Sequence, residues 1–145
     1  MEFVSFVDNT PVFVAAIANP HVKKDYIETE DYDSENLITY TVDRSRLDIV
    51  TELLTPAGIE PAALRPVELT AVILLLVASN RGVTVLPDWV VREVKYSSDY
   101  VTRPITENGL TKRLYAAVRT DDATRPYFAH FIRLARTEPV KLQRQ

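Results

Sequence analysis

The chain of 145 residues contains no cysteine, which excludes disulfide bonds and metal sites with thiolate ligands. Its two histidines, His21 and His130, lie far apart in the sequence and do not have the spacing of metal ligands. The net charge is −3, and no run of Lys and Arg is long enough to neutralise a phosphate backbone. The composition therefore gives no support to a nucleic-acid-binding surface or a cysteine-based metal site.

Long hydrophobic runs are also lacking. The most apolar segment, Ala71–Ala78, is much shorter than the roughly 20 residues that a membrane-spanning helix needs. The N-terminal residues carry no positive charge before the first apolar residues, so they do not form a signal peptide. We expect a cytoplasmic protein with no membrane partner.

The length suits one domain or two small lobes with a real core. Short apolar runs alternate with amphipathic segments, which predicts an α/β protein with mostly parallel sheets. The expected strands are residues 2–7, 11–18, 37–42, 62–69, 83–86, 100–104 and 110–119. The expected helices begin near residues 45, 70, 89 and 124, and residues 22–35 form a polar loop with a short helix near its end.

The segment from Leu69 to Trp89 carries the clearest local pattern. Thr70 can cap a buried helix, and Gly82 can end it in the left-handed conformation. A β-branched strand follows, and Pro87 stands where the next helix begins. In a parallel sheet the C-terminal end of such a strand commonly faces a ligand crevice.

The junction Arg44-Ser45-Arg46 is the best candidate site that the residues alone offer. Free amides at a helix start, a hydroxyl and two cations suit a carboxylate-bearing small molecule. The alternative is an ordinary helix cap, in which Ser45 and Asp48 form a capping box and the arginines are solvated. General frequencies favour the cap.

Other clusters point to no chemistry of their own. The acidic run from Glu28 to Glu35 lacks the spacing and the glycine of a calcium loop, so we interpret it as a solvated loop. No G-x-S-x-G motif, phosphate loop or paired carboxylates on adjoining strands are present. We therefore expect no enzyme activity, no metal and no cofactor.

Four pieces of sequence together resemble a known family. They are VASNRGVTVLP (77–87), YTVDRSRLD (40–48), LPDWVV (86–91) and LYAAVR (114–119). In this order they are similar to the effector-binding domain of LysR-type transcriptional regulators, and among those to the regulators of methionine biosynthesis. The resemblance implies a two-lobed fold like that of type-2 periplasmic binding proteins. It also implies a first lobe that is incomplete in this chain, at residues 1–38 and 106–145, and a complete second lobe at 39–105.

The resemblance also implies a function and a site. The effector would be a small molecule, homocysteine, bound between the lobes. The implied effector-binding residues are Thr41, Arg44, Ser45, Arg46, Thr70, Pro87 and Trp89. A single Trp at a helix start is more often a half-buried packing residue, and Thr70 also suits a simple helix cap.

In such a regulator, effector binding alters the DNA-binding state of a homo-oligomer, a dimer or higher. DNA would be bound only by an N-terminal winged helix-turn-helix, which this sequence does not contain. With part of one lobe absent, we expect weak effector binding or none. The alternative is a solute-binding domain of a transport system with the same two-lobed plan, which predicts a secretion signal and a complete first lobe.

Overall fold

The chain folds into two units, each with its own sheet. The computed structural model describes residues 1–94 and 98–142, and side chains of the last helix as far as Glu138. Unit 1 combines Met1–Thr10 with Thr111–Gln145, and unit 2 is Pro11–Leu110. In the described residues no helix is both long enough and apolar enough to cross a membrane.

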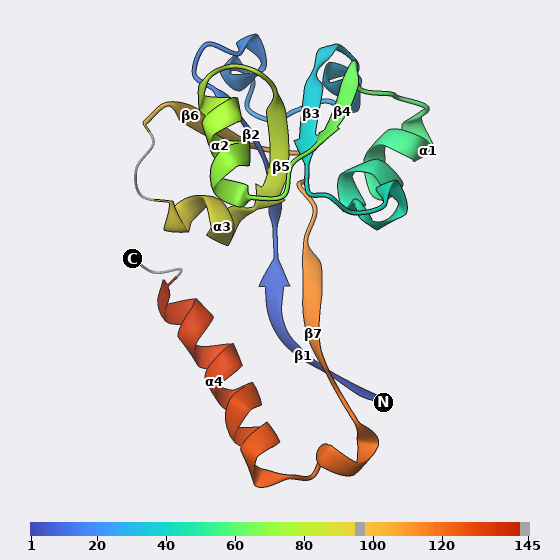
Figure 1. The fold of residues 1–145 in the computed structure, drawn as a ribbon, viewed down its shortest axis with the longest axis vertical. Helices are drawn as coiled ribbons and strands as arrows, with labels where there is room; N and C mark the ends of the chain where they lie inside the picture. The colour runs from blue at the N-terminus through green and yellow to red at the C-terminus, as the bar shows by residue number, and fades with distance from the viewer. Residues whose placement is uncertain (95–97, 143–145) are drawn as a thin grey trace. The chain divides into compact units, whose positions relative to one another are not determined.

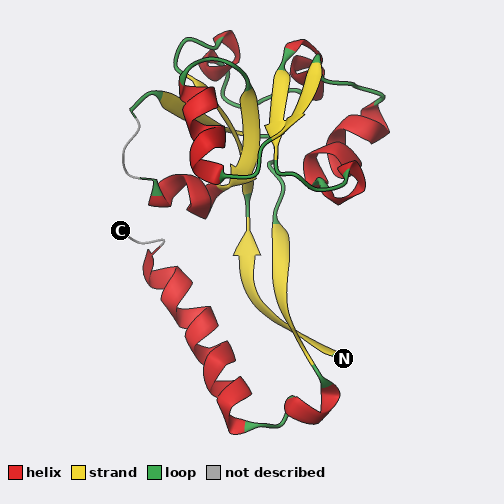
Figure 2. Cartoon of the chain, in the orientation of Figure 1, coloured by secondary structure: helices red, strands yellow, loops and turns green. Residues whose placement is uncertain are grey.

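Unit 2 is built on a five-stranded mixed sheet (Figures 1 and 2). Its order is β4 (Ala63–Pro66), β3 (Asn36–Thr39), β5 (Val83–Pro87), β2 (Pro11–Ala16) and β6 (Tyr100–Pro104). The three strands β4, β3 and β5 are parallel. The expectation of mostly parallel sheets is wrong in this detail, because β2 runs against both of its neighbours, β5 and β6.

Helical segments cover both faces of this sheet, because successive side chains of a strand point to opposite faces. On one face Phe13, Leu37 and Val83 are buried with residues of the wide π-type turns Ile49–Leu54, which continue into α1 (Thr55–Ala57). On the other face Val14 and Ile38 are buried with α2 (Thr70–Ala78) and α3 (Asp88–Glu93). Unit 2 is therefore a three-layer α/β/α structure.

Unit 1 contains the antiparallel pair β1 (Glu2–Asn9) and β7 (Lys112–Val118) and the helix α4 (Pro126–Leu142). The pairing of β1 with β7 shifts register between Ser5 and Val7. Arg136 of α4 donates two hydrogen bonds to the Ser5 carbonyl oxygen, at 2.8 and 3.1 Å. Among the side chains of α4 that the structure describes, as far as Glu138, only Ile132 is buried.

The short 3₁₀ turns of the chain lie at Pro20–Lys23, Thr29–Ser34, Arg44–Arg46 and Thr120–Asp122. The first two occupy the segment expected to be a loop with a short helix. The expected regular helix after Ser45 is replaced by the 3₁₀ turn, the π-type turns and α1. Gly58 ends α1 in the left-handed conformation, with φ 70°.

The two ends of α2 differ from the prediction. Leu69, not Thr70, is the capping residue at its start, and no side chain caps the helix there. At its end Asn80 takes the left-handed conformation, with φ 57°, while the amides of Asn80 and Arg81 bond to the carbonyls of Val77 and Leu76. These are the two bonds of a Schellman motif. Gly82 has another role: a Cβ there would lie 2.6 Å from the Asn36 carbonyl oxygen.

Along the chain, the boundaries between the two units lie at Thr10/Pro11 and at Leu110/Thr111. The expected boundaries between the lobes lie at 38/39 and 105/106. The expected strand pair that crosses between lobes, 37–42 with 100–104, is wrong: β3 and β6 both belong to unit 2 and are separated by β5 and β2. The cause is β2, which pairs with β5 and β6 and so ties the segment after Pro11 to that sheet. β1 and β2 form no hairpin with each other.

Candidate functional site

The C-terminal ends of three parallel strands bring the seven candidate residues to one edge of the unit 2 sheet. After β3 the chain continues through Thr41 to Arg46, after β4 it reaches Thr70, and β5 ends at Pro87 just before Trp89. In the sheet, β4 lies on one side of β3, and β5, the next strand along the chain, lies on the other side of β3. An edge where strand order reverses in this way is where α/β proteins bind ligands.

The loop after β3 is exposed and held by its own side chains. The Asp43 carboxylate accepts hydrogen bonds from the Ser45 amide at 2.9 Å and from the Ser45 hydroxyl at 2.5 Å. The hydroxyl bond, and then the amide bond, hold the pKa of Asp43 below its ordinary value. Asp43 is therefore the cap of this turn, and the predicted capping box of Ser45 and Asp48 is wrong, because no side chain caps the start of Ile49–Leu54.

The two arginines of this loop differ in their partners. Arg44 donates from Nη2 to both carboxylate oxygens of Glu60, at 2.6 and 2.7 Å. The side chain of Arg46 is exposed and has no hydrogen bond or ion pair in the described parts of the chain. Arg46 is thus the cation of this loop that is free to receive an anion.

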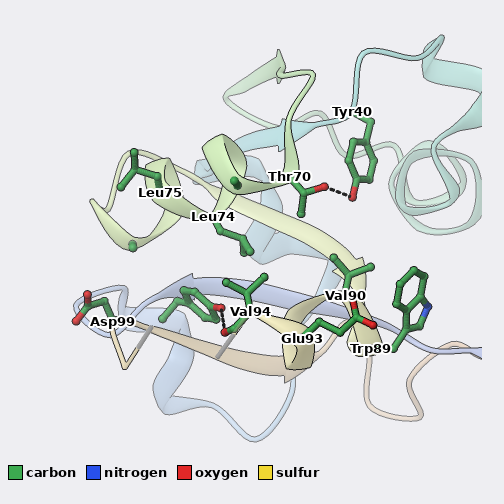
Figure 3. Close-up of a pocket in the computed structure, with 12 residues that line it drawn as sticks. Tyr40, Thr70, Leu74, Leu75, Trp89, Val90, Glu93, Val94 and Asp99 are labelled. Atoms are coloured by element: carbon green, nitrogen blue, oxygen red, sulfur yellow. Dashed lines mark hydrogen bonds between the residues drawn. The ribbon is translucent and has the colours of Figure 1, made fainter. Parts of the chain in front are cut away.

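A hydrogen bond that the sequence did not indicate joins this loop to α2. The hydroxyls of Tyr40 and Thr70 lie 3.0 Å apart and are partly buried (Figure 3). Thr70 is the first residue of α2, so this bond anchors the helix start to the end of β3. Tyr40 opens the segment YTVDRSRLD, but nothing in the sequence shows that it reaches a residue 30 positions away.

Beside the strand ends, α2 and α3 enclose an open groove of about 770 Å³. Thr70 and Trp89 line it, and the other five candidate residues do not. In Figure 3, Leu74 from α2 faces Val94 at the end of α3. The other lining residues are also mostly apolar, and none of them was a predicted site residue. They are Tyr40, Ala71, Leu75, Ala78, Val90, Glu93, Asp99 and Tyr100. Such walls suit an aliphatic or aromatic group.

The acidic run of residues 28–35 is more structured than a solvated loop. Asp31 accepts hydrogen bonds from Lys24 Nζ at 2.8 and 2.9 Å, and His21 lies between Asp31 and Glu35, with N···O distances of 3.4 and 3.3 Å. Within the described residues no three His, Cys, Asp or Glu side chains are arranged to hold a metal ion. Side chains of the chain itself, Lys24 and His21, thus contact the carboxylates of Asp31 and Glu35.

Comparison with known proteins identifies the family. Residues 1–139 match the family described as the LysR substrate binding domain. The chain belongs to this LysR family. Among curated relatives, the transcriptional regulator MetR of Escherichia coli (strain K12) is 42% identical over 123 residues, which are 85% of this chain and 38% of that protein. MetR of Haemophilus influenzae is 34% identical over 116 residues, 80% of this chain and 37% of its own length.

Solved structures agree with this assignment. The regulatory domain of MetR from N. meningitidis superposes with a TM-score of 0.89 at 36% identity, covering 97% of this chain and 64% of that one. The effector-binding domain of QuiR in complex with shikimate gives 0.71 at 23% identity, with 97% and 66% covered, and supports the fold alone. The chain is therefore a MetR-like LysR regulatory domain with the periplasmic-binding-protein-like fold, and its named relatives are transcription regulators.

Proposed function

We propose that this chain senses homocysteine for a regulator of methionine biosynthesis. The observation that carries the proposal is the edge formed by β4, β3 and β5, which gathers the candidate residues in a family of effector-binding domains. The resemblance of residues 40–48 and 77–91 to regulators of methionine biosynthesis supports the choice of effector class. The proposed site consists of Thr41, Arg44, Ser45, Arg46, Thr70, Pro87 and Trp89.

The chemistry of these residues suits an amino acid with a sulfur-bearing side chain. Arg46 would pair with the effector carboxylate, because charge-assisted bonds of this kind are the strong ones. The hydroxyls of Thr41 and Thr70 would supply further polar contacts. Trp89, which is 39% exposed, would form an apolar wall for the thiol-bearing chain together with the α2–α3 groove. Arg44, already bound to Glu60, would hold the loop in position.

We propose further that unit 2 corresponds to the second lobe of the two-lobed fold and unit 1 to part of the first. The 64% coverage of the N. meningitidis MetR regulatory domain supports this. An effector that contacts both lobes shifts their equilibrium by its differential affinity for the two arrangements. In the longer proteins this shift would reach DNA-binding heads through a homo-oligomer in the cytoplasm. The chain itself would neither contact DNA nor catalyse a reaction.

Calorimetric titration of the chain with homocysteine, homoserine and methionine tests the proposal. We expect weak binding of homocysteine, in the millimolar range, and weaker binding of homoserine, whose hydroxyl is costlier than a thiol to place against Trp89. Replacing Arg46 by Gln removes the cation that is free to bind the carboxylate. The dissociation constant should rise about 10- to 100-fold, since a hydrogen bond to a charged group contributes about 1.5–3 kcal/mol.

The matched control is Arg119→Gln, which removes an exposed arginine from unit 1, to which none of the seven candidate residues belongs. It should leave the dissociation constant within about twofold, as expected of a solvated charge. Equal effects of the two substitutions, or no heat with homocysteine at tens of millimolar, would contradict the proposed site.

A further inference from the structure

The hydroxyl of Tyr40 meets that of Thr70 at the start of α2, and the proposed function gives Tyr40 no role. The two oxygens lie 3.0 Å apart and are partly buried (Figure 3). Within the parts of the chain that the structure describes, neither hydroxyl has another hydrogen-bond partner. Two hydroxyls bring two hydrogens, and the bond between them uses only one. The other hydrogen is therefore left for a further acceptor.

Acidity favours Tyr40 as the donor of this bond, because a phenol is a stronger acid than an aliphatic alcohol and donates better. The position of the phenol oxygen is also fixed. The ring of Tyr40 packs against the buried cluster that includes Ile38 and Leu74, and the Tyr40 carbonyl accepts a hydrogen bond from the Val42 amide at 2.9 Å. Packing and backbone together thus hold the phenol in place against Thr70.

Helix α2 itself does not take up the hydrogen of Thr70. A threonine inside a helix can donate to a carbonyl of the preceding turn, as Thr137 does to Arg133 at 3.0 Å. Thr70 is the first residue of α2, so no helical turn precedes it. The amides of Thr70 and Ala71 also have no backbone partner or capping side chain among the described residues. The helix start thus presents a hydroxyl and two amides as donors.

We propose that Tyr40 is a positioning residue of the effector site. It donates its hydrogen to Thr70, so that the Thr70 hydroxyl in turn donates to the carboxylate of an amino-acid effector. This inference rests on the proposed function, and it adds to the site a residue that the seven candidates do not include. A carboxylate only accepts hydrogen bonds, whereas a carboxamide both donates and accepts. A hydroxyl fixed as a donor therefore favours the carboxylate.

Selectivity distinguishes this role from a merely structural one. Without the phenol hydrogen, the Thr70 hydroxyl can rotate and can either donate or accept. It then suits a carboxamide as well as a carboxylate. If Tyr40 only kept α2 and the end of β3 together, its loss would weaken the binding of both ligands by the same factor.

An NMR titration of the whole chain, followed on the backbone amides, tests the inference with homocysteine and homocysteine carboxamide as probes. Tyr40→Phe removes the phenol hydroxyl and keeps the ring. The dissociation constant for homocysteine should rise about 3- to 10-fold, as for the loss of one hydrogen bond, and that for the carboxamide less than about twofold.

Tyr32→Phe is the matched control. Tyr32 is fully buried in the cluster on the other face of the sheet, so its hydroxyl cannot reach a ligand. This variant should leave both dissociation constants unchanged within about twofold. Circular dichroism checks that all variants are folded.

A double-mutant cycle with Thr70→Val then shows whether Tyr40 acts through Thr70. Valine keeps the shape of threonine and lacks the hydroxyl, so Thr70→Val alone should raise the dissociation constant for homocysteine about 10-fold or more. In the Thr70→Val background, Tyr40→Phe should add less than about twofold, because the hydroxyl that Tyr40 orients is already absent.

Three results would overturn the inference and leave the proposed function in place. They are homocysteine binding that Tyr40→Phe does not change, equal losses for homocysteine and its carboxamide, and a full effect of Tyr40→Phe in the Thr70→Val background. An unchanged chain that binds neither probe would remove the proposed function and the inference together.

Discussion

The contacts of the Asp31 carboxylate differ from those expected for a residue in a solvated acidic loop. It lies in an acidic run, yet it accepts hydrogen bonds from Lys24 and from the Glu28 amide, the latter at 2.9 Å. Burial alone would raise the pKa of Asp31, but these bonds outweigh it and hold the pKa below the ordinary value of 3.8. The hydrogen bonds that Lys24 donates to Asp31 and then to the Glu28 carboxylate raise the pKa of Lys24.

The lowered pKa of Asp31 gives a pH-dependent contribution to stability. The charged form is favoured by folding, so the contribution is present above the unfolded-state pKa near 3.8 and is lost as the pH falls through the lower folded-state value. Asp31→Asn should therefore lower the free energy of unfolding by about 1 kcal/mol at pH 7, a modest amount because Lys24 is partly exposed. The difference from the unchanged chain should shrink below about pH 4 and vanish in stronger acid.

Urea unfolding at a series of pH values measures this difference. Asp33→Asn is the control, since Asp33 lies in the same 3₁₀ turn but is exposed. It should change stability by less than about 0.5 kcal/mol at every pH. A loss for Asp31→Asn that persists unchanged at pH 2 would mean that the charge of Asp31 is not the cause.

At the scale of single residues, the sequence predicted the candidate site only in part. The sequence indicated which segments follow the strands, and all seven candidate residues lie at or shortly after the C-terminal ends of β3, β4 and β5. It could not indicate that Arg44 is bound to Glu60 or that Asp43 engages Ser45, because these choices depend on side-chain distances within the folded loop. The contact of Tyr40 with Thr70 depends on how β3 and α2 are placed, which no local pattern encodes.

At the scale of elements, periodicity and β-branched runs were reliable guides. Residues 100–104 form β6 as predicted. β5 ends one residue later than predicted, and α3 begins one residue earlier. The ends of α2 were less predictable, because asparagine and glycine both tolerate the left-handed conformation and two such residues stand close together. Asn80 takes that conformation, and Gly82 instead allows β5 to approach the backbone of β3.

The close approach at Gly82 predicts a specific pattern of substitutions. Gly82→Ala should lower the free energy of unfolding by about 1–3 kcal/mol, because the added Cβ would meet the Asn36 oxygen at 2.6 Å and Ile38 Cδ1 at 2.9 Å. Gly109→Ala should cost about 1–2 kcal/mol for a different reason, its φ of 66° in open space. Thermal or urea unfolding measures both.

Asparagine distinguishes the two causes. Gly109→Asn should be less destabilising than Gly109→Ala, because asparagine tolerates a positive φ. Gly82→Asn should be at least as destabilising as Gly82→Ala, because the obstacle there is space. If asparagine rescued position 82 as well, the close contact with β3 would not be the reason for the glycine.

At the scale of the whole chain, the division into units was the least predictable feature. The only break between β1 and β2 is Thr10, and both strands are apolar enough to suit one sheet. Their partners are far along the chain: β1 pairs with β7, and β2 pairs with β5 and β6. Pairing over such distances is decided by tertiary contacts, so local sequence patterns do not indicate where the two units divide, at Thr10/Pro11 and at Leu110/Thr111.

The separate sheets imply that the two units unfold separately. Both buried clusters of unit 2 draw their members from residues 12–110, while Ile132, 6% exposed, lines a hollow of unit 1 together with Val4 and Phe128. Ile132→Ala should destabilise unit 1 by about 2–4 kcal/mol through the lost burial and the cavity left behind. In native-state hydrogen exchange, amides of β1, β7 and α4 should lose protection while those of β3 and β5 keep theirs.

Leu134→Ala provides the comparison for this experiment, because Leu134 is 42% exposed on the same helix and its truncation should cost less than about 1 kcal/mol. An equal loss of protection in β3 and β5 with Ile132→Ala would show one cooperative unit instead of two. Protection lost in unit 1 alone would mean that the sheet carrying the candidate site stays folded when unit 1 opens. Because all seven candidate residues belong to unit 2, homocysteine should then protect the amides of unit 2 against exchange even in the Ile132→Ala variant.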